Sequence, residues 1–599
     1  MRLGVQLPLA FLSLHLGRFT LAVDTWCGKA YRSSDPAVDP GGRIVAPPRS
    51  PAPLLNLKIR PRAQPYLEED IVGTFIVDAP LSYFYGQPYD NTLFGQQNDG
   101  ALKLLSNVSE YNTISFYVNR SDDAIRPISY ATVKLNSTGT LFDFDLSEFE
   151  PRFEPYNLSV VAMAPNNHIY MASTQILRLP SRSDGGSVTK IDSLHGGLLV
   201  KATTISNSSS GAWTPLFPYS FYLDGNWLGE DPKNMNVLKN YGYNVLHIVP
   251  AGGLGYDFEQ LDEWLDQAQQ LGLWIMFDMR WQYQNASGVD WQVNQLKRRP
   301  NMLLWYTADE PDGQVDALNA PKRAYDQIKS LDPYHPVSLC LNCENYHYQE
   351  YSTGADIILS DVYPIGTNTS WSTQYGTVCN STYGCCGCDN CQGYNNLSNV
   401  PARLDIYREY QMQLGLPPKV LWGTPQAFGN SEFWKQTPTP EEEVAMTLLS
   451  VNHGAKGIIM WTFPTTPDLT DVTSRLAKVL TGTCAEYLLG ADIITGLAVD
   501  GTSAVDASAW RVGNSILLSI VNSDYQDMTG PVTLHLPAEI VATSISTVLW
   551  GDAEWRVTNV DSKTQIQRSG LQGLSSDILI LSLELPLFVE EQDSTAVAR

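Results

Sequence analysis

Acidic side chains follow several apolar segments of this chain, at points where parallel strands would end. In the clearest case Asp309 and Glu310 stand side by side after an apolar run, and Asp361, Asp278 and Asp224 end three others. Like charges gathered in one cleft raise each other's pKa, so one of them can hold a proton at mildly acidic pH. Hydrolysis of a glycosidic bond needs such a pair, a protonated acid at the leaving oxygen and an ionised partner as nucleophile or base.

A simpler interpretation exists for each acid, because Asp often caps a helix directly after a strand. We favour it for Asp312, which lies in a Pro-Asp-Gly turn sequence. For Glu310 we favour catalysis. Asp309, Asp278 and Asp224 are then candidates for contacts with the substrate.

Other hydrolytic chemistries lack their residues. A serine nucleophile would suit a Gly-x-Ser-x-Gly turn, which this sequence does not contain. Only eight His occur, without His-x-His or His-Glu-x-x-His spacing, so the ligands of a metal hydrolase are missing. We therefore expect neither a metal nor a cofactor.

Aromatic residues accompany the acids, and they suit a sugar cleft because ring faces stack on the apolar faces of sugars. They lie at or near the predicted strand ends, where Gln426 adds a further polar candidate for substrate binding. The aromatic candidates are Trp281, Tyr283, Tyr363, Trp371, Phe428, Trp434 and Trp461. Each could equally be a core residue; Tyr363, Trp281 and Trp461 are the ones we assign to substrate binding.

The elements that must position these residues alternate between strand and helix. Amphipathic helices are predicted at 258–268 and, after Pro440, at 441–449, where the acidic first turn suits a helix start. Eight apolar runs predict strands at 219–223, 245–249, 274–278, 303–307, 336–341, 356–360, 420–424 and 457–461.

This alternation predicts an α/β fold with a closed (β/α)8 barrel, a TIM barrel, over residues 215–482. In such a barrel the reactive groups lie at the C-terminal ends of the strands. An open doubly wound sheet is the alternative, but residues 224–229 do not match the Gly-rich phosphate loop that usually follows its first strand.

Segments of β character flank the barrel. Short alternating runs separated by Gly, Asn, Asp and Pro predict an N-terminal β-sandwich at 56–180, and the same pattern returns in a C-terminal β-sandwich at 483–599. A Pro-rich leader at 23–55 precedes the first sandwich, and 181–214 is a linker leading into the barrel.

The termini and composition indicate export. Residues 1–22 have the charge and apolar pattern of a secretory signal peptide. The net charge of -24 repels phosphate backbones and anionic lipids, so we expect no nucleic acid or membrane partner and a monomer. Nine sequons predict N-glycosylation, at Asn107, Asn119, Asn136, Asn157, Asn207, Asn285, Asn368, Asn380 and Asn396.

Seven of the nine cysteines gather in one stretch, which predicts a loop held by disulfides in an oxidising compartment. Two Cys-x-x-Cys spacings also fit zinc, an interpretation that export disfavours. Because nine is odd, one thiol should be free or paired outside the chain. The disulfide candidates are Cys340, Cys343, Cys379, Cys385, Cys386, Cys388 and Cys391.

The strand ends resemble those of the clan A glycoside hydrolases, whose fourth strand ends in a small residue, Asn or Asp, and then Glu-Pro, and whose eighth ends in Trp. The resemblance implies that Glu310 is the acid/base, that Asp309 contacts the sugar 2-hydroxyl in place of the usual Asn, and that Trp461 lines the cleavage subsite. The leader, with Trp26-Cys27-Gly28-Lys29 and Pro40-Gly41-Gly42, also resembles secreted fungal proteins that carry such barrels.

One departure from that family concerns the nucleophile. The clan places a Glu at the end of strand seven, whereas this chain has Thr424-Pro425-Gln426 and no carboxylate until Glu432. Either Glu432 loops back, or the strand register differs, or the second carboxylate lies elsewhere, with Asp361 the best substitute.

These residues lead to two main hypotheses. The first is an extracellular O-glycosidase acting on wall polysaccharide or glycoprotein glycans, with a wall-remodelling transglycosylase as a variant that would use the same site. The second is a non-catalytic carbohydrate-binding or wall protein that kept the barrel and lost its nucleophile.

Overall fold

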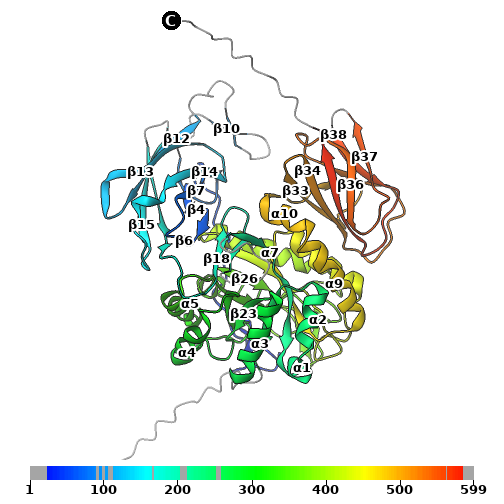
Figure 1. Ribbon diagram of the computed structural model, residues 1–599. Coiled ribbons are helices and arrows are strands. Elements are labelled where there is room, and N and C mark those ends of the chain that lie inside the picture. Colours follow the sequence, from blue (N-terminus) through cyan, green and yellow to red (C-terminus); the bar gives the residue numbers. More distant parts are fainter. Residues whose placement is uncertain are drawn as a thin grey trace, which may run out of the picture.

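The centre of the protein is a closed barrel of eight parallel strands, as predicted (Figure 1). The structure is a computed structural model that describes residues 23–89, 94–96, 102–104, 112–164, 168–202, 212–250, 258–560 and 563–584. The barrel strands, in order, are β21 (Tyr219–Asp224), β22 (Val245–Val249), β23 (Trp274–Asp278), β24 (Met302–Asp309), β25 (Val337–Leu341), β26 (Ile357–Ser360), β29 (Val420–Gly423) and β30 (Ile458–Phe463).

Side chains alternate between two cores along each strand, because successive residues of a strand point to opposite faces. In β21, Phe221 and Leu223 join the core between strands and helices, while Tyr222 points into the barrel. The interior also holds Tyr306 of β24 and Trp422 of β29, both fully buried. The barrel interior is therefore a packed core, and residues that can reach a substrate lie at the ends of its strands.

Helices surround the barrel strands. The helix α8 begins with a capping box in which Thr439 and Glu442 bond each other's backbone, and Pro440 occupies its first turn. The helices are α1 (Gly225–Glu230), α2 (Asn234–Tyr241), α3 (Phe258–Leu271), α4 (Ala286–Leu296), α5 (Ala320–Leu331), α6 (Tyr348–Ser352), α7 (Asn399–Gln413), α8 (Pro440–Asn452), α9 (Pro467–Leu480) and α10 (Thr483–Gly490).

The N-terminal β domain packs two antiparallel sheets around one core, with the orders β13-β12-β15-β16 and β14-β7-β4. A further sheet, β20-β19-β18-β5, connects it to the barrel. The strands are β4 (Lys58–Pro61), β5 (Ala63–Gln64), β7 (Val72–Asp78), β12 (Thr113–Arg120), β13 (Asp123–Lys134), β14 (Thr140–Asp145), β15 (Tyr156–Met163), β16 (Ile169–Ile176), β18 (Val188–Asp192), β19 (Leu198–Lys201) and β20 (Thr214–Leu216).

The C-terminal β domain has a five-stranded sheet, β31-β33-β34-β39-β36, and a four-stranded sheet, β32-β35-β38-β37, around a third core. The strands are β31 (Ile493–Ile494), β32 (Ala498–Val499), β33 (Val505–Val512), β34 (Ser515–Asn522), β35 (Val532–His535), β36 (Ala542–Trp550), β37 (Arg556–Val560), β38 (Lys563–Arg568) and β39 (Ser576–Leu583). Flanking β domains were predicted on both sides of the barrel, and their predicted boundaries remain predictions.

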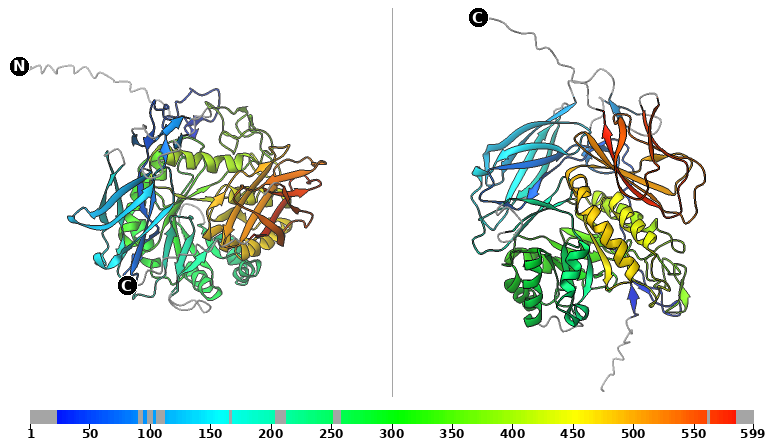
Figure 2. Two further views of the ribbon diagram at one scale, coloured as in Figure 1. Left: turned by 90° about the horizontal axis from the view of Figure 1, so that it is seen from above. Right: turned by 45° about the vertical axis from the view of Figure 1, so that its right-hand side comes forward.

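Both β domains lie above the barrel in Figure 1. The C-terminal domain contacts α8, α9 and α10, and β18 of the connecting sheet contacts β24. The leader takes another path: its hairpin of β1 (Thr25–Trp26) and β2 (Lys29–Ala30) lies at the lower end of the barrel, as the blue arrow in the right panel of Figure 2 shows. The chain thus reaches the end of the barrel opposite the β domains before it enters them.

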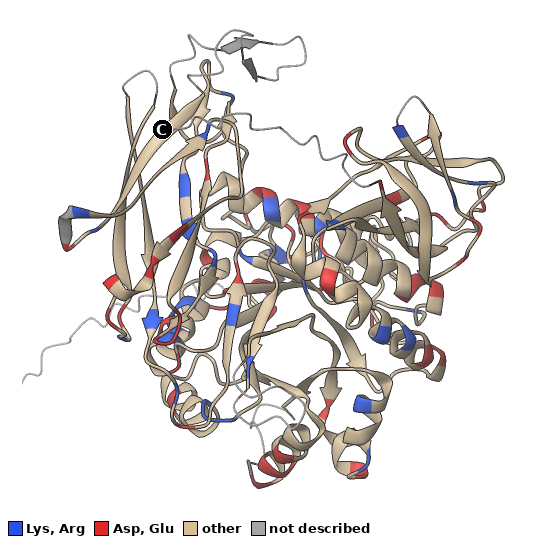
Figure 3. Ribbon diagram, turned by 45° about the horizontal axis from the view of Figure 1, so that its top comes forward, with Lys and Arg blue, Asp and Glu red and all other residues tan. Residues whose placement is uncertain are grey.

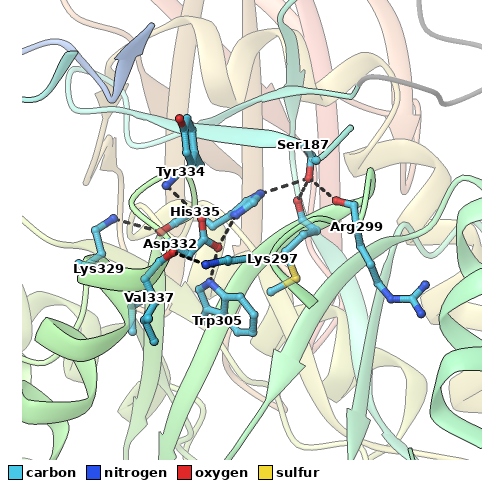
Figure 4. A network of polar contacts seen from close by, with 12 residues as sticks. Ser187, Lys297, Arg299, Trp305, Lys329, Asp332, Tyr334, His335 and Val337 are labelled. Carbon is cyan, nitrogen blue, oxygen red and sulfur yellow. Dashed lines mark hydrogen bonds and ion pairs between the residues drawn. The ribbon is translucent and has the colours of Figure 1, made fainter. Parts of the chain in front are cut away.

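A buried polar network anchors the connecting sheet to the upper end of the barrel (Figure 4). His335 lies 3.2 Å from Ser187 Oγ through Nε2 and 2.7 Å from Asp332 through Nδ1. The three side chains form a serine-histidine-aspartate chain, but Ser187 and His335 are 0% exposed, and Ser187 Oγ donates to the Met302 carbonyl at 2.6 Å. Because no substrate can reach Ser187, these three hydrogen-bonded side chains hold the linker against the barrel and do not perform nucleophilic catalysis.

Charged residues are spread over the molecule. Figure 3 shows acidic positions on both β domains and on the barrel helices, with basic positions among them. Among the described residues, no helix is long and apolar enough to cross a membrane. The predicted signal peptide, residues 1–22, lies outside the described residues.

The predicted glycosylation sites are distributed over the described surface. Asn119 and Asn396 are half-buried, while Asn107 and Asn207 lie outside the described residues. Glycosylation therefore stays a prediction for all nine. The exposed sites are Asn136, Asn157, Asn285, Asn368 and Asn380.

Candidate active site

Glu310 stands directly after β24, at the C-terminal end of the barrel. Its backbone has φ of 51°, a left-handed conformation that non-glycine residues rarely adopt and that costs of order 1–3 kcal/mol. The neighbouring chain holds it there, since the Glu310 N–H donates to the Cys340 carbonyl at 3.2 Å and the Gln314 N–H donates to the Glu310 carbonyl at 3.0 Å. Strain of this kind is typical of functional positions.

Asn342 joins Glu310 to Asp361. This amide follows β25, and its Nδ2 donates to Glu310 Oε1 at 2.9 Å and lies 3.3 Å from both carboxyl oxygens of Asp361. Asp361 follows β26 and is 3% exposed, whereas Glu310 is half-buried. The structure therefore brings together the two carboxyl groups that the sequence selected.

A hydrogen bond between the two carboxyl groups links their protonation. Burial first, and then the negative charge and hydrogen bond of Glu310, raise the pKa of Asp361 well above its ordinary value. Burial also raises the pKa of Glu310, although hydrogen bonds from Asp361 and Asn342 oppose the shift. Two acids this close cannot both ionise near neutral pH, so one proton stays with the pair.

Carboxyl groups that hydrogen-bond each other, as these do, lie closer than a glycosidase normally needs between its acid and its second carboxylate. Retaining enzymes place these about 5–5.5 Å apart and inverting enzymes roughly 6.5–9.5 Å apart. A sugar ring cannot occupy the space between hydrogen-bonded carboxyl groups. In this arrangement Asp361 acts on Glu310 by changing its pKa through their hydrogen bond. A substrate would have to reach Glu310 from its exposed side.

We expect Asp361→Asn to be more stable than the wild type at neutral pH. The folded protein keeps a proton on Asp361 that the unfolded chain releases near pH 4 (about 3.9 for free Asp), so stability falls as pH rises above that value toward the raised pKa. An uncharged Asn removes this loss. Urea unfolding midpoints should differ most near about pH 8 and converge toward about pH 4; a difference independent of pH would contradict the prediction. Asp326→Asn, at an exposed acid, is the control.

A buried ion network lies beside the pair. Arg280 contacts Asp278 through Nη2 at 2.7 Å and Asp309 through Nη1 at 2.6 Å. His247 Nε2 approaches Asp278 Oδ2 at 2.9 Å, and the Tyr306 hydroxyl donates to Asp309. Arg280 thus holds the carboxylate next to Glu310 in one orientation.

The protonation states of this network follow from the balance of burial and charge. Burial alone would raise the pKa of Asp278, but Arg280 and His247 outweigh it and leave that pKa below its ordinary value. Burial lowers the pKa of His247. Asp278 is 0% exposed, so it supports Arg280 and is not available to a substrate as the sequence had suggested.

Aromatic rings surround the acids. The Arg280 guanidinium lies 5.4 Å from the centre of the Trp461 ring, which is half-buried. Tyr363 packs edge-on against Phe428 and Trp434, with ring centres 5.1 and 5.9 Å away. Trp461 therefore lies beside the ion network, whereas Tyr363 is buried among other rings; their role in substrate binding stays a prediction.

Three other residues that were predicted to contact the substrate lie in surroundings unlike those of Trp461. Gln426 is 0% exposed and bonds the backbone of Ile365 and Phe428, so its amide supports a loop. Asp224 is exposed and caps α1 by accepting from the Asn226 N–H at 2.9 Å. Trp281 is 47% exposed, and its Nε1 donates to the Pro250 carbonyl at 3.3 Å.

Two further acids were considered in the sequence: Asp312 as a turn residue and Glu432 as the missing strand-seven carboxylate. Asp312 accepts from the backbone N–H groups of Gly313, Asn342 and Cys343 at 2.9, 3.2 and 2.8 Å, and burial raises its pKa to about 7. It therefore ties two loops together, as turn chemistry suggested. Glu432 lies exposed beyond β29 and does not take the place of the missing strand-seven carboxylate.

The disulfides differ from the expectation in two places. Cys343 pairs with Cys27 of the leader, and Cys379 with Cys386 and Cys388 with Cys391 form the remaining bonds. Cys340 and Cys385 were predicted to pair but are free, as is Cys484. Cys340 stays free because it is the second-last residue of strand β25 and its side chain is buried in the barrel interior.

A pocket of about 360 Å³ lies between the leader hairpin and the cysteine-rich insert, residues 379–391. Trp26, Glu344 and Asn390 line it, and the Asn390 amide donates to Glu344 at 2.6 Å. Trp26 also donates a hydrogen bond to Asn342, the amide that contacts both acids. The pocket therefore adjoins the residue that joins the acid pair.

Sequence reasoning missed three residues of this site: Arg280, Asn342 and Trp26. Asn342 directly follows the fifth strand, so reading every strand end in the same way would have found it. Arg280 stands two residues after Asp278, where an Arg beside a buried acid indicates an ion pair. No sequence signal connects Trp26 with a barrel that begins nearly two hundred residues later (β21 starts at Tyr219).

No protein-family model matches this sequence, and neither does any curated protein. Among solved structures, a maltogenic α-amylase from Thermotoga neapolitana is similar at 13% identity and a TM-score of 0.40, over 62% of this chain and 99% of that one. An α-amylase from Geobacillus thermoleovorans has 9% identity and a TM-score of 0.41 over 61% and 98%. An endoxylanase from Clostridium papyrosolvens has 13% identity and a TM-score of 0.38 over 61% and 96%. Similarity at this level assigns no activity and no residue role to this chain.

Proposed function

We propose that this protein is a secreted glycoside hydrolase that cleaves O-glycosidic bonds of a polysaccharide or glycan, with Glu310 as the proton donor. The observation that carries the proposal is the Glu310–Asp361 pair, which shares a proton at the C-terminal end of a closed barrel and is joined by one amide of Asn342. Export, predicted from the termini and sequons, is part of the proposal.

The charge state of the pair suits this chemistry. The pair holds one proton, which rests on Asp361, the acid with the more strongly raised pKa. Glu310 is the less buried member, so it takes up this proton and passes it to the leaving oxygen as the bond to the anomeric carbon breaks. Both carboxylates are then ionised for a moment, and the Asn342 amide, which donates to both, stabilises that charge. A water molecule then gives its hydroxyl to the anomeric carbon, and its proton returns to Glu310.

The surroundings of the pair favour a sugar as substrate. Trp461 offers a ring face beside Arg280 and Asp309, and the adjoining pocket of about 360 Å³ carries a Trp, a carboxyl group and amides. Rings and paired donors and acceptors of this kind bind the apolar faces and hydroxyl groups of sugars.

A non-catalytic carbohydrate-binding protein was the alternative, motivated by the missing strand-seven Glu. A binding surface has no need for a strained Glu310 or for a buried carboxyl group that keeps its proton, and both lower the stability of the fold. These features favour the enzyme.

A panel assay tests the proposal directly. The purified protein is incubated with 4-nitrophenyl glycosides and with cellulose, xylan, laminarin, chitin and starch, and new reducing ends or nitrophenol are measured. We expect release from at least one member, and a loss of release from the polysaccharides of roughly 10²–10⁴-fold in the Glu310→Gln variant. Sugar binding without cleavage of any member would point to the binding protein instead.

A further inference from the structure

The leader hairpin is fastened to the catalytic end of the barrel by several contacts. Cys27 forms a disulfide with Cys343, directly after Asn342 in the sequence, and the Cys27 N–H donates to the Gly313 carbonyl at 3.3 Å. Lys29 forms a buried ion pair with Asp389 of the cysteine-rich insert. Covalent and ionic bonds therefore hold a segment that has almost no core of its own against the loops that carry Glu310.

Trp26 of this hairpin contacts the amide that joins the two acids. Its Nε1–H donates to Asn342 Oδ1 at 2.9 Å. The indole lies over Gly313, where an added Cβ would come within 2.4 Å of the ring. Glycine is therefore required at position 313, because any side chain there would collide with the Trp26 ring.

The hydrogen bond selects one orientation of the Asn342 amide. An indole N–H can only donate, so the atom that faces Trp26 must be the carbonyl oxygen. The NH2 group is then left to face Glu310 and Asp361, which is the orientation observed. If the amide turned over, its oxygen would face carboxyl oxygens and the donation to both acids would be lost.

We propose that Trp26 is a positioning residue of the active site, which orients Asn342 and thereby fixes the proton-sharing pair, so that the leader is a functional part of the barrel. This inference rests on the proposed function. The hydrogen bond from Asn342 lowers the pKa of Glu310 against the stronger effect of burial. Weakening that bond should therefore make Glu310 a weaker acid.

Trp26→Phe tests this assignment, because Phe keeps an aromatic ring and lacks the N–H donor. The assay follows the pH dependence of kcat and kcat/KM on the 4-nitrophenyl glycoside that the wild type cleaves fastest. We expect kcat to fall about five- to tenfold, the factor that one lost hydrogen bond represents, and the alkaline limb of the profile to move to higher pH. A purely structural Trp would lower kcat without moving the limb.

Two further variants complete the test. Trp291→Phe replaces a Trp that is 46% exposed on α4 and should leave the profile unchanged. In an Asn342→Ala background the Trp26→Phe change should have no further effect on the alkaline limb. An unmoved limb in Trp26→Phe, or an additive shift in the double variant, would overturn the role of Trp26. Wild-type turnover of an unactivated glycoside by Glu310→Gln would instead overturn the proposed function.

Discussion

Glu310→Gln is expected to lower turnover of a natural glycoside by roughly 10²–10⁴-fold, the usual contribution of a positioned general acid. Gln has the same shape and can still accept the hydrogen bond that Asn342 donates to Oε1, so the loop should keep its structure. It cannot deliver a proton to the leaving oxygen. The loss should therefore appear in kcat, while sugar binding stays close to that of the wild type.

The leaving group makes this prediction specific to proton donation. A sugar alkoxide leaves only when it is protonated, whereas a 2,4-dinitrophenolate is stable enough to leave as the anion. Glu310→Gln should therefore damage cleavage of an unactivated disaccharide far more than cleavage of a 2,4-dinitrophenyl glycoside, as measured by kcat/KM on both. The alkaline limb of the pH profile should also disappear, because the group that loses its proton there is gone.

Glu443→Gln is the matched control. Glu443 is a buried carboxyl group of α8 that accepts a hydrogen bond from Thr447. Burial raises its pKa well above the ordinary value, and it lies outside the proposed site. We expect both substrates to be cleaved within about twofold of the wild-type rate, which is below the effect of one hydrogen bond. Equal losses on both leaving groups in Glu310→Gln would exclude the general-acid role.

Arg280→Leu is expected to destabilise the barrel by about 3–5 kcal/mol, the usual effect of removing one partner from a buried ion pair. The larger part comes from Asp278, whose side chain is 0% exposed and would keep its charge without the guanidinium group that balances it. Asp309 would lose the contact that orients it next to Glu310. Urea unfolding monitored by tryptophan fluorescence measures the first effect, and kcat/KM measures the second.

Arg299→Leu provides a comparison on the surface. Arg299 also bridges two acids, Asp262 and Asp266, but these are 62% and 67% exposed. Water already solvates them, so the loss should stay below about 1 kcal/mol. If Arg280→Leu unfolded no more easily than Arg299→Leu, the ion network could not be what holds the catalytic end together.

The fold could be predicted because its signals are local. Buried parallel strands leave nearly continuous apolar runs, and eight such runs alternating with helical patterns leave few architectures other than a barrel. The acid at Glu310 could be found for the same reason, because the end of a strand in such a barrel is a defined place. The free thiols Cys340 and Cys385 could not, because pairing depends on distances that spacing along the chain does not encode.

The sequence by itself determined the barrel, the strand ends and the acids placed on them, because apolar periodicity and residue type act over a few neighbouring positions. The tertiary structure alone decided which of those groups meet. It placed Asp361 against Glu310 through Asn342, buried Asp278 beneath Arg280, and brought Trp26 from the far N-terminal leader to the same amide. The physical reason is that a proton shared by two acids, or an amide fixed by an indole, depends on separations of about 3 Å between residues that are distant in sequence.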